Sequence, residues 1–279
     1  MAERSSRIAR IKTSNLALLR LLCATYWSIK FSVMSRSVRL VYRRKDGLVV
    51  NRQANLTFCS FEPNSTTATD IERLALDNWV GGLELERGAV VVDVGAGIGE
   101  DALVFSRLVG TSGKVFAVEA HPRTYQCLEA TIRCNRNLTR NITPVNLALS
   151  SYCGLAKMAS GESYLSNALA SEGVAVRVST LNAFFDQYQI SRVDLLKVNI
   201  EGAEWPLLEQ ADLSRVVNIS ISCHDFIDGV EEMQTYDRVR AKVLAAGFSL
   251  LPRRQHANPW IKFLLYGYRA NPPSLNHEN

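Results

Sequence analysis

Short apolar runs alternate with helical patterns along the chain from residue 89 onward. The apolar runs predict strands over residues 89–94, 114–118, 143–147, 193–198 and 217–222. Apolar positions three and four residues apart predict helices over residues 99–110, 122–136, 203–210 and 230–245, the last ending at Gly247. Two more strands are expected near 248–251 and 261–268. This alternation predicts an α/β fold with helices on both faces of a mostly parallel sheet.

A different pattern precedes this core. Residues 48–61 alternate enough to predict a hairpin, and Asp70 is a candidate cap for a helix that carries Ile71, Leu74, Leu76 and Trp79. We therefore expect a cap unit over residues 46–86, a main domain over 87–270 and a tail over 271–279. Within the main domain, residues 159–173 are rich in Ser, Gly and Ala and are predicted to form one long loop.

Residues 1–45 form a separate basic extension. Apolar side chains recur there at helical spacing, namely Leu18, Leu19, Leu22, Tyr26, Ile29 and Val33. Arg20 and Lys30 interrupt this stretch, so it is too short for a transmembrane helix. A basic amphipathic helix of this kind either lies on an anionic membrane surface or packs on the protein. Both alternatives remain open on the sequence alone.

Charge and cysteine content narrow the class of protein. The chain has a formal net charge of +5, but residues 1–45 hold eleven basic residues and one acidic residue, so the rest is acidic. Nucleic-acid binding by the body of the protein is therefore not expected. The six cysteines include no Cys-x-x-Cys pair, which favours a reducing, cytoplasmic location, with residues 1–45 as a possible peripheral contact to the inner membrane surface.

A glycine loop at the end of the first core strand is the main candidate for binding chemistry. Gly95, Gly97 and Gly99 allow a sharp turn close to a ligand, and Asp93, just before them, can receive a cationic amino group. Glu119 ends the next strand, where an acidic residue can accept hydrogen bonds from both ribose hydroxyls. The predicted nucleoside-cofactor site also includes neighbouring residues on each strand end: Ala96, Ala120, Leu147 and Ala148, the last two near the adenine.

The charges around the loop favour S-adenosyl-L-methionine (SAM) over a dinucleotide. The glycine spacing is Gly-x-Gly-x-Gly rather than Gly-x-Gly-x-x-Gly. Glu100 and Asp101 occupy the amino terminus of the following helix, where they would repel a pyrophosphate. SAM carries no phosphate and has a cationic sulfonium and ammonium. An NAD-dependent oxidoreductase on a Rossmann-like fold remains the first alternative.

A second motif gives a more specific resemblance. Residues 193–204 read VDLLKVNIEGAE, and residues 180–184 supply a Thr-Leu-x-x-Phe element. With the glycine loop, these stretches resemble the FkbM family of class I SAM-dependent methyltransferases, from about residue 90 to 224. The resemblance implies a Rossmann-like fold with seven strands. It also implies O-methylation, with a sugar, glycolipid or polyketide-like hydroxyl as acceptor.

The same resemblance nominates the catalytic residues. The family usually has Asp where this chain has Asn199, an amide that is a poorer base and a poorer ligand for a hard cation, so no metal is expected. Glu201 is favoured over Glu204 as a site residue, because Glu204 begins a helix. His224 is the candidate general base, and Lys197 could orient a carboxylate. A catalytically retired SAM-fold binding protein at a membrane surface is the other alternative, with Asn199 as its support.

Overall fold

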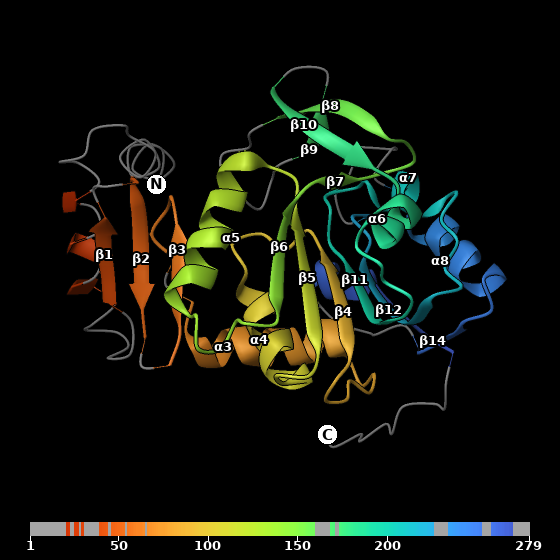
Figure 1. The fold of residues 1–279 in the computed structure, drawn as a ribbon, viewed down its shortest axis with the longest axis horizontal. Helices are drawn as coiled ribbons and strands as arrows, with labels where there is room; N and C mark the ends of the chain where they lie inside the picture. Colours follow the sequence, from red (N-terminus) through yellow and green to blue (C-terminus); the bar gives the residue numbers. More distant parts are fainter. Residues whose placement is uncertain are drawn as a thin grey trace.

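The computed structural model describes eleven stretches of the chain, and they build three β-sheets and their covering helices (Figure 1). These stretches are residues 21–22, 25–27, 29–30, 39–43, 46–53, 55–64, 66–159, 168–170, 173–225, 234–252 and 258–269.

The largest sheet has seven strands in the order β13-β14-β12-β11-β4-β5-β6. These are β4 (Val90–Val94), β5 (Lys114–Glu119), β6 (Ile142–Asn146), β11 (Val193–Val198), β12 (Val216–Ser222), β13 (Ser249–Leu250) and β14 (Leu264–Tyr268). Strands β12, β11, β4, β5 and β6 run parallel, and β14 pairs antiparallel with both β12 and β13. The predicted seven-stranded, mostly parallel sheet is confirmed.

Helices cover both faces of this sheet because both faces of its strands are apolar. Successive side chains of a strand point to opposite faces. On β4, Val91 packs into a core with α4 (Glu100–Val109) and α5 (Pro122–Cys134), whereas Val92 packs into a second core on the other face. That second core includes residues of α6 (Leu181–Gln187), α7 (Glu204–Leu208) and α8 (Tyr236–Ala245).

A three-stranded antiparallel sheet precedes the main one. It contains β1 (Arg39–Arg43), β2 (Leu48–Arg52) and β3 (Thr57–Ser60). Strands β2 and β3 form the predicted hairpin, and β1 adds residues from the stretch that we assigned to the basic extension. Helix α5 lies between β3 and the main sheet (Figure 1), so this small sheet packs on the helix that follows Glu119.

The helix after the hairpin is present, but its predicted cap is wrong. Helix α3 (Ala68–Ala75) is capped by Thr67, whose hydroxyl accepts a hydrogen bond from the backbone N–H of Asp70 at 3.1 Å. Thr67 has the extended backbone that an N-cap needs, whereas Asp70 lies inside the first turn. A π-helical turn, Leu76–Val80, continues α3 and buries Trp79.

The single long loop predicted over residues 159–173 is also wrong at several positions. A four-stranded sheet in the order β7-β10-β8-β9 occupies this part of the chain. Its strands are β7 (Ala148–Leu149), β8 (Gly154–Ala159), β9 (Ala168–Ala170) and β10 (Val174–Ser179). The small residues of β8 and β9 have a low intrinsic preference for strands, so the sequence did not predict these strands. Pairing with neighbouring strands stabilises them. Residues 160–167 and 171–172 of the predicted loop lie outside the described residues.

The carboxyl-terminal elements differ from expectation mainly at their starts. Helix α8 begins at Tyr236, and the predicted start at residue 230 lies outside the described residues. A short helix, α9 (Pro259–Lys262), takes the first residues of the strand predicted over 261–268. In the part of the chain that the structure describes, no helix combines the length and apolar character needed to cross a bilayer.

Candidate functional site

The glycine loop lies at the carboxyl end of β4, in the middle of the parallel strands. The backbone N–H groups of Gly95 and Ala96 both donate to the Val118 carbonyl of β5, at 2.9 and 3.0 Å. Gly95 has φ +78°, and a Cβ there would collide with the backbone carbonyl of Asn199. Glycine is therefore required at position 95 because the loop packs against the end of β11.

A buried ion pair between β11 and β4 lies next to the glycine loop and holds it in place. Lys197 of β11 and Asp93 of β4 are partners in strand register, and Lys197 Nζ lies 2.7 Å from Asp93 Oδ1. The same ammonium donates to the Gly95 carbonyl at 2.8 Å and lies 3.7 Å from Asp101 Oδ2. Burial alone would lower the pKa of Lys197, but the carboxylates of Asp93 and Asp101 outweigh it and raise that pKa. The cation that we expected Asp93 to receive is here supplied by the protein itself.

Glu119, at the end of β5, is tied to the glycine loop. Its Oε2 accepts from the Gly97 N–H at 3.0 Å, and its Oε1 accepts from the His121 N–H at 2.8 Å. Burial raises the pKa of Glu119 to about 7, although these two backbone donors oppose the shift. Each carboxylate oxygen retains a further lone pair, so Glu119 can still accept from ribose hydroxyls.

Asn199 adds a buried acceptor beside the loop. Its backbone N–H continues the β11–β4 ladder to the Val94 carbonyl at 3.0 Å. Among the described residues, no donor reaches its side-chain Oδ1, which is buried. A buried polar atom without a partner is unfavourable unless a ligand satisfies it. The glycine backbone, Glu119 and this amide oxygen together fit the SAM expected from the sequence.

An apolar cluster adjoins the cofactor side of this edge. Ala148 packs with the buried side chains of Met158, Val176 and Val178, and Ala120 packs against this group. Leu147 lies in the core on the other side and donates its N–H to the Glu119 carbonyl at 3.2 Å. The four-stranded sheet thus covers the residues that follow β5 and β6, where the adenine was expected.

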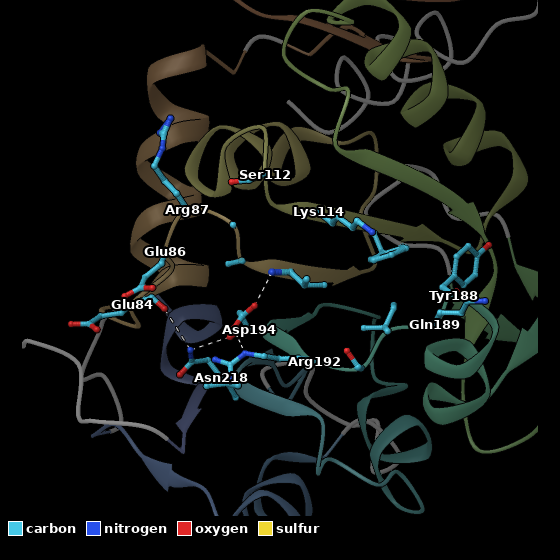
Figure 2. A pocket seen from close by; sticks show the side chains of 17 residues that line it. Glu84, Glu86, Arg87, Ser112, Lys114, Tyr188, Gln189, Arg192, Asp194 and Asn218 are labelled. Carbon is cyan, nitrogen blue, oxygen red and sulfur yellow. Dashed lines mark hydrogen bonds and ion pairs between the residues drawn. The ribbon is translucent and has the colours of Figure 1, made fainter.

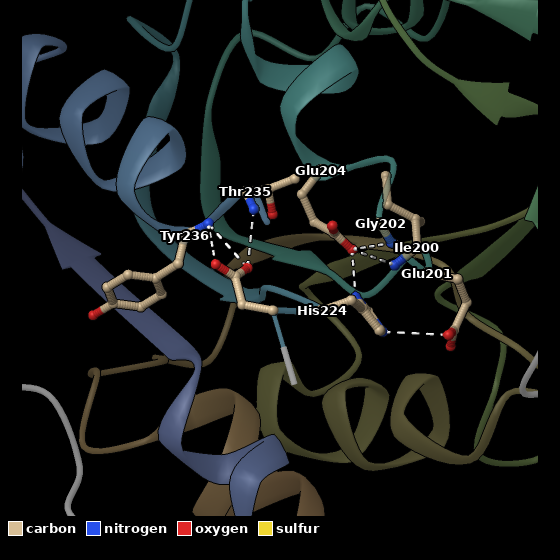
Figure 3. Close-up of polar contacts among 8 residues, drawn as sticks. Ile200, Glu201, Gly202, Glu204, His224, Thr235 and Tyr236 are labelled. Atoms are coloured by element: carbon tan, nitrogen blue, oxygen red, sulfur yellow. Dashed lines mark hydrogen bonds and ion pairs between the residues drawn. The ribbon is translucent and has the colours of Figure 1, made fainter. Parts of the chain in front are cut away.

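A histidine held by two carboxylates occupies the neighbouring strand ends (Figure 3). His224 follows β12, and its Nδ1 lies 2.8 Å from Oε1 of Glu204. Its Nε2 lies 3.4 Å from Oε2 of Glu201, in the turn after β11. His224 and Glu204 are buried, whereas the side chain of Glu201 is 26% exposed. The order β12-β11-β4-β5 places this group and the glycine loop at one edge of the sheet.

These carboxylates change the charge state of the histidine. Burial would lower the pKa of His224, but hydrogen bonds and charge from Glu201 and Glu204 outweigh it and raise the pKa to about 9. This shift favours the protonated imidazole at neutral pH. A protonated imidazole is a poorer general base than a neutral one, so the role of His224 as the base stays a prediction.

Glu204 is the residue whose importance sequence reasoning underestimated. Its Oε1 accepts from the backbone N–H groups of Ile200 and Gly202, at 3.3 and 3.2 Å, besides meeting His224. It therefore fixes the turn in which Glu201 adopts φ +52°. The three-residue spacing of Glu201 and Glu204 was a signal for this pairing, since a tight turn can bring both carboxylates to one side chain.

A separate cavity lies at the opposite edge of the sheet (Figure 2). It measures about 730 Å³ and is lined at the amino ends of the strands, by Val90, Lys114 and Asn218 among others. Asp194 closes one side by accepting from the Val90 N–H at 2.8 Å and from Arg192 at 2.7 Å. Open parallel sheets bind ligands at the carboxyl ends, so this cavity is separate from the candidate site.

Comparisons with known proteins identify a family and a similar fold. The Methyltransferase FkbM domain model matches residues 93–250, more than half of the chain. A solved methyltransferase FkbM from Methylobacillus flagellatus is 16% identical, with a TM-score of 0.50 over 73% of this chain. This chain covers only 51% of that protein, about half of its length. An O-methyltransferase from Bacillus cereus, solved in complex with SAH, is 14% identical over 73% of this chain and 82% of its own, with a TM-score of 0.46.

No curated protein matches the sequence. The FkbM match nevertheless contains Asp93, the glycine loop, Glu119 and the His224 group in one continuous stretch. The Methylobacillus structure supports the same fold. The nucleoside cofactor is therefore SAM rather than NAD, and the chain belongs to the FkbM family of SAM-dependent methyltransferases.

Proposed function

We propose that the protein transfers a methyl group from SAM to a hydroxyl of a sugar, glycolipid or polyketide-like acceptor. The observation that carries this proposal is the Glu201–His224–Glu204 group beside the glycine loop. Methylation of a hydroxyl oxygen releases a proton, and this group supplies a partly exposed carboxylate to take it. The resemblance of residues 180–204 to the FkbM motifs supports a hydroxyl acceptor of these classes.

In this proposal, different residues at the carboxyl edge of the sheet bind the cofactor and position the acceptor. When bound, SAM supplies a methyl group activated by its sulfonium. The glycine backbone and Glu119 would hold the nucleoside, and the Asn199 amide oxygen would accept from the ammonium. Lys197 lies beneath the loop and acts by holding Asp93 and the Gly95 carbonyl in place. Asn199 and Lys197 therefore serve binding rather than proton transfer.

Proton removal falls to Glu201 in this proposal. Its carboxylate is accessible, whereas His224 is buried and already protonated at neutral pH. A hydroxyl becomes far more acidic as its oxygen is alkylated, so a carboxylate is a sufficient acceptor. The His224 imidazolium holds Glu201 in position, and Glu204 holds His224. Alignment of the acceptor oxygen by these groups contributes a large part of the rate.

The acceptor class can be tested by labelling. The protein is incubated with SAM carrying an isotopically labelled methyl group and with cell extract separated into lipid, glycan and small-molecule fractions. We expect label in one of these fractions, with Glu201→Gln as the inactive control. Label in none of them, with binding of S-adenosylhomocysteine confirmed by calorimetry, would instead favour a catalytically retired binding protein.

We also propose that residues 1–45 bring the protein to an anionic membrane surface. Residues 21–22, 25–27 and 29–30 are helical, and Leu22, Tyr26 and Ile29 are each more than half exposed. They stand at a spacing of four and three residues, so they share one face. Trp27 instead packs toward Leu40 and Val49 of the small sheet. Of the described helical residues, Trp27 thus contacts the protein and Leu22, Tyr26 and Ile29 are exposed, while Leu18, Leu19 and Val33 lie outside the described residues.

Vesicle sedimentation tests this membrane contact. We expect the protein to sediment with phosphatidylserine-containing vesicles more than with phosphatidylcholine vesicles, and less at high salt. The Leu22→Ser/Ile29→Ser variant should lose this binding while its methyl transfer to a soluble acceptor is retained. Equal sedimentation of this variant and the wild type would exclude the exposed face as the contact.

A further inference from the structure

Two thiols that are distant in sequence meet where the small sheet packs on the main domain. Cys59 lies in β3, Cys134 is the last residue of α5, and their sulfur atoms are 3.8 Å apart. Both are free thiols in this structure. A disulfide has sulfur atoms about 2.05 Å apart, so the two side chains need to approach by less than about 2 Å. Sequence spacing gave no sign of this pair, because 75 positions separate the two residues.

The backbones that carry these thiols are held together by direct hydrogen bonds. The Cys59 N–H donates to Thr131 Oγ1 of α5 at 3.0 Å. Asn135, just after α5, accepts from the Thr57 N–H at 3.0 Å and donates to the Thr57 carbonyl at 2.7 Å. These bonds fix β3 against the last turn of α5. The thiols are therefore kept as neighbours by the fold.

The two thiols differ in access and in their neighbouring groups. Cys134 is exposed, and the Arg43 guanidinium donates to its sulfur at 3.9 Å. Cys59 is fully buried, and burial raises its pKa to about 12. An exposed thiol next to a second thiol is the arrangement of an attacking and a resolving cysteine.

We propose that Cys134 and Cys59 form an oxidation site that closes to a disulfide when the protein meets a hydroperoxide. The Cys134 thiolate attacks the peroxide, the O–O bond breaks, and a sulfenic acid and a hydroxide (or alkoxide) form. The Cys59 thiol then displaces the sulfenic hydroxyl as water and forms the S–S bond. Sulfur is oxidised and the peroxide oxygen is reduced, so no further oxidant is required.

This bond would join the small sheet covalently to the methyltransferase domain. Helix α5 begins at Pro122, three residues after Glu119, so the link reaches the element that leads away from the cofactor edge. The segment that follows β3 also contacts that edge through Asn64, whose Nδ2 donates to Glu100 Oε1 at 2.8 Å. Oxidation would therefore restrict movement of the small sheet relative to the methyltransferase domain.

Peptide mapping tests the pairing directly. Full-length protein is treated with hydrogen peroxide, free thiols are blocked, and the chain is digested with trypsin without reduction. Trypsin places Cys59 in residues 53–73, Cys134 in residues 134–136 and Cys127 in residues 124–133. We expect residues 53–73 linked to 134–136, and release of the link by dithiothreitol. Cys59 linked to residues 124–133, or Cys134 oxidised to sulfinic acid without a link, would overturn the proposal.

Stability measurements provide a second readout that does not depend on a variant of the buried residue. Peroxide should raise the urea midpoint of the wild type and of Cys153→Ser, which removes an exposed thiol elsewhere. It should not raise the midpoint of Cys134→Ser. An equal rise in Cys134→Ser would assign the effect to another residue and contradict the pair.

Discussion

His224 lies between two carboxylates, and these contacts determine what we expect when single residues of the site are replaced. Replacement of His224 by Gln keeps a hydrogen-bond donor near Glu204 but removes the positive charge that holds Glu201. We expect kcat for methyl transfer to fall by about 100-fold because Glu201 is misplaced, with little change in the affinity for S-adenosylhomocysteine. Methyl-transfer assays and calorimetry measure the two quantities. Loss of that affinity with an unchanged kcat would assign His224 to cofactor binding.

Lys197 tests whether the ion pair under the glycine loop is structural. Removing one partner of a buried pair leaves an uncompensated charge, so Lys197→Met should lower the free energy of unfolding by about 3–5 kcal/mol. The double variant Lys197→Met/Asp93→Asn removes both charges and should regain part of this loss. Urea denaturation measures both. Equal destabilisation of the single and double variants would show that the charge of Asp93 does not depend on Lys197.

Much of the candidate site was predictable residue by residue, but its pairings were not. Asp93, Glu119, Glu201 and His224 stand at strand ends that apolar runs reveal. The contact between Lys197 and Asp93 depends on the register of β11 against β4, and these residues are 104 positions apart. The raised pKa of His224 depends partly on Glu204. From the sequence, Glu204 was interpreted only as the acidic residue that begins a helix. Tertiary contacts thus determine roles that residue types leave open.

At the scale of elements, the loop after β4 requires glycine for a packing reason that can be measured. Gly95→Ala should destabilise the protein and weaken binding of S-adenosylhomocysteine, because its Cβ would collide with the Asn199 carbonyl. Gly82→Ala is the matched control, since Gly82 has φ +90° but no atom within 4 Å of the added Cβ. Thermal unfolding and calorimetry compare the two. Equal losses would show that backbone strain alone explains the glycine.

The elements that sequence predicted well are those with long apolar runs. Strands β4, β5, β11 and β12 are buried on both faces, so their composition alone identifies them. The four-stranded sheet was missed because β8 and β9 consist largely of small residues and are stabilised by pairing with neighbours. Thr67, rather than Asp70, caps α3 because capping depends on backbone geometry as well as on a polar side chain.

At the scale of the whole molecule, buried titratable groups predict how stability depends on pH. The folded state raises the pKa of Glu119 to about 7 and of His224 to about 9, so it binds more protons than the unfolded chain. Stability from His224 is fully present below pH 6.5 and is lost as the pH rises through about 9. The loss amounts to roughly 3 kcal/mol.

Urea denaturation between pH 6 and 9.5 measures this dependence. The wild type should lose stability as the pH rises across this interval, and His224→Gln should show a flatter profile above pH 7. A wild-type midpoint that rises over the same interval would contradict the sign derived from the His224 pairing.

The arrangement of the entire carboxyl edge, with a glycine loop on one side and the Glu201–His224–Glu204 group on the other, is the basis of our proposal of methyl transfer onto oxygen. The bond that holds the transferred methyl group tests this most directly. Labelled product is heated with hydriodic acid, which cleaves O-methyl ethers to volatile methyl iodide. We predict that the label leaves as methyl iodide under conditions that spare N-methyl and C-methyl standards. Label that stays bound to the product under those conditions would contradict O-methylation.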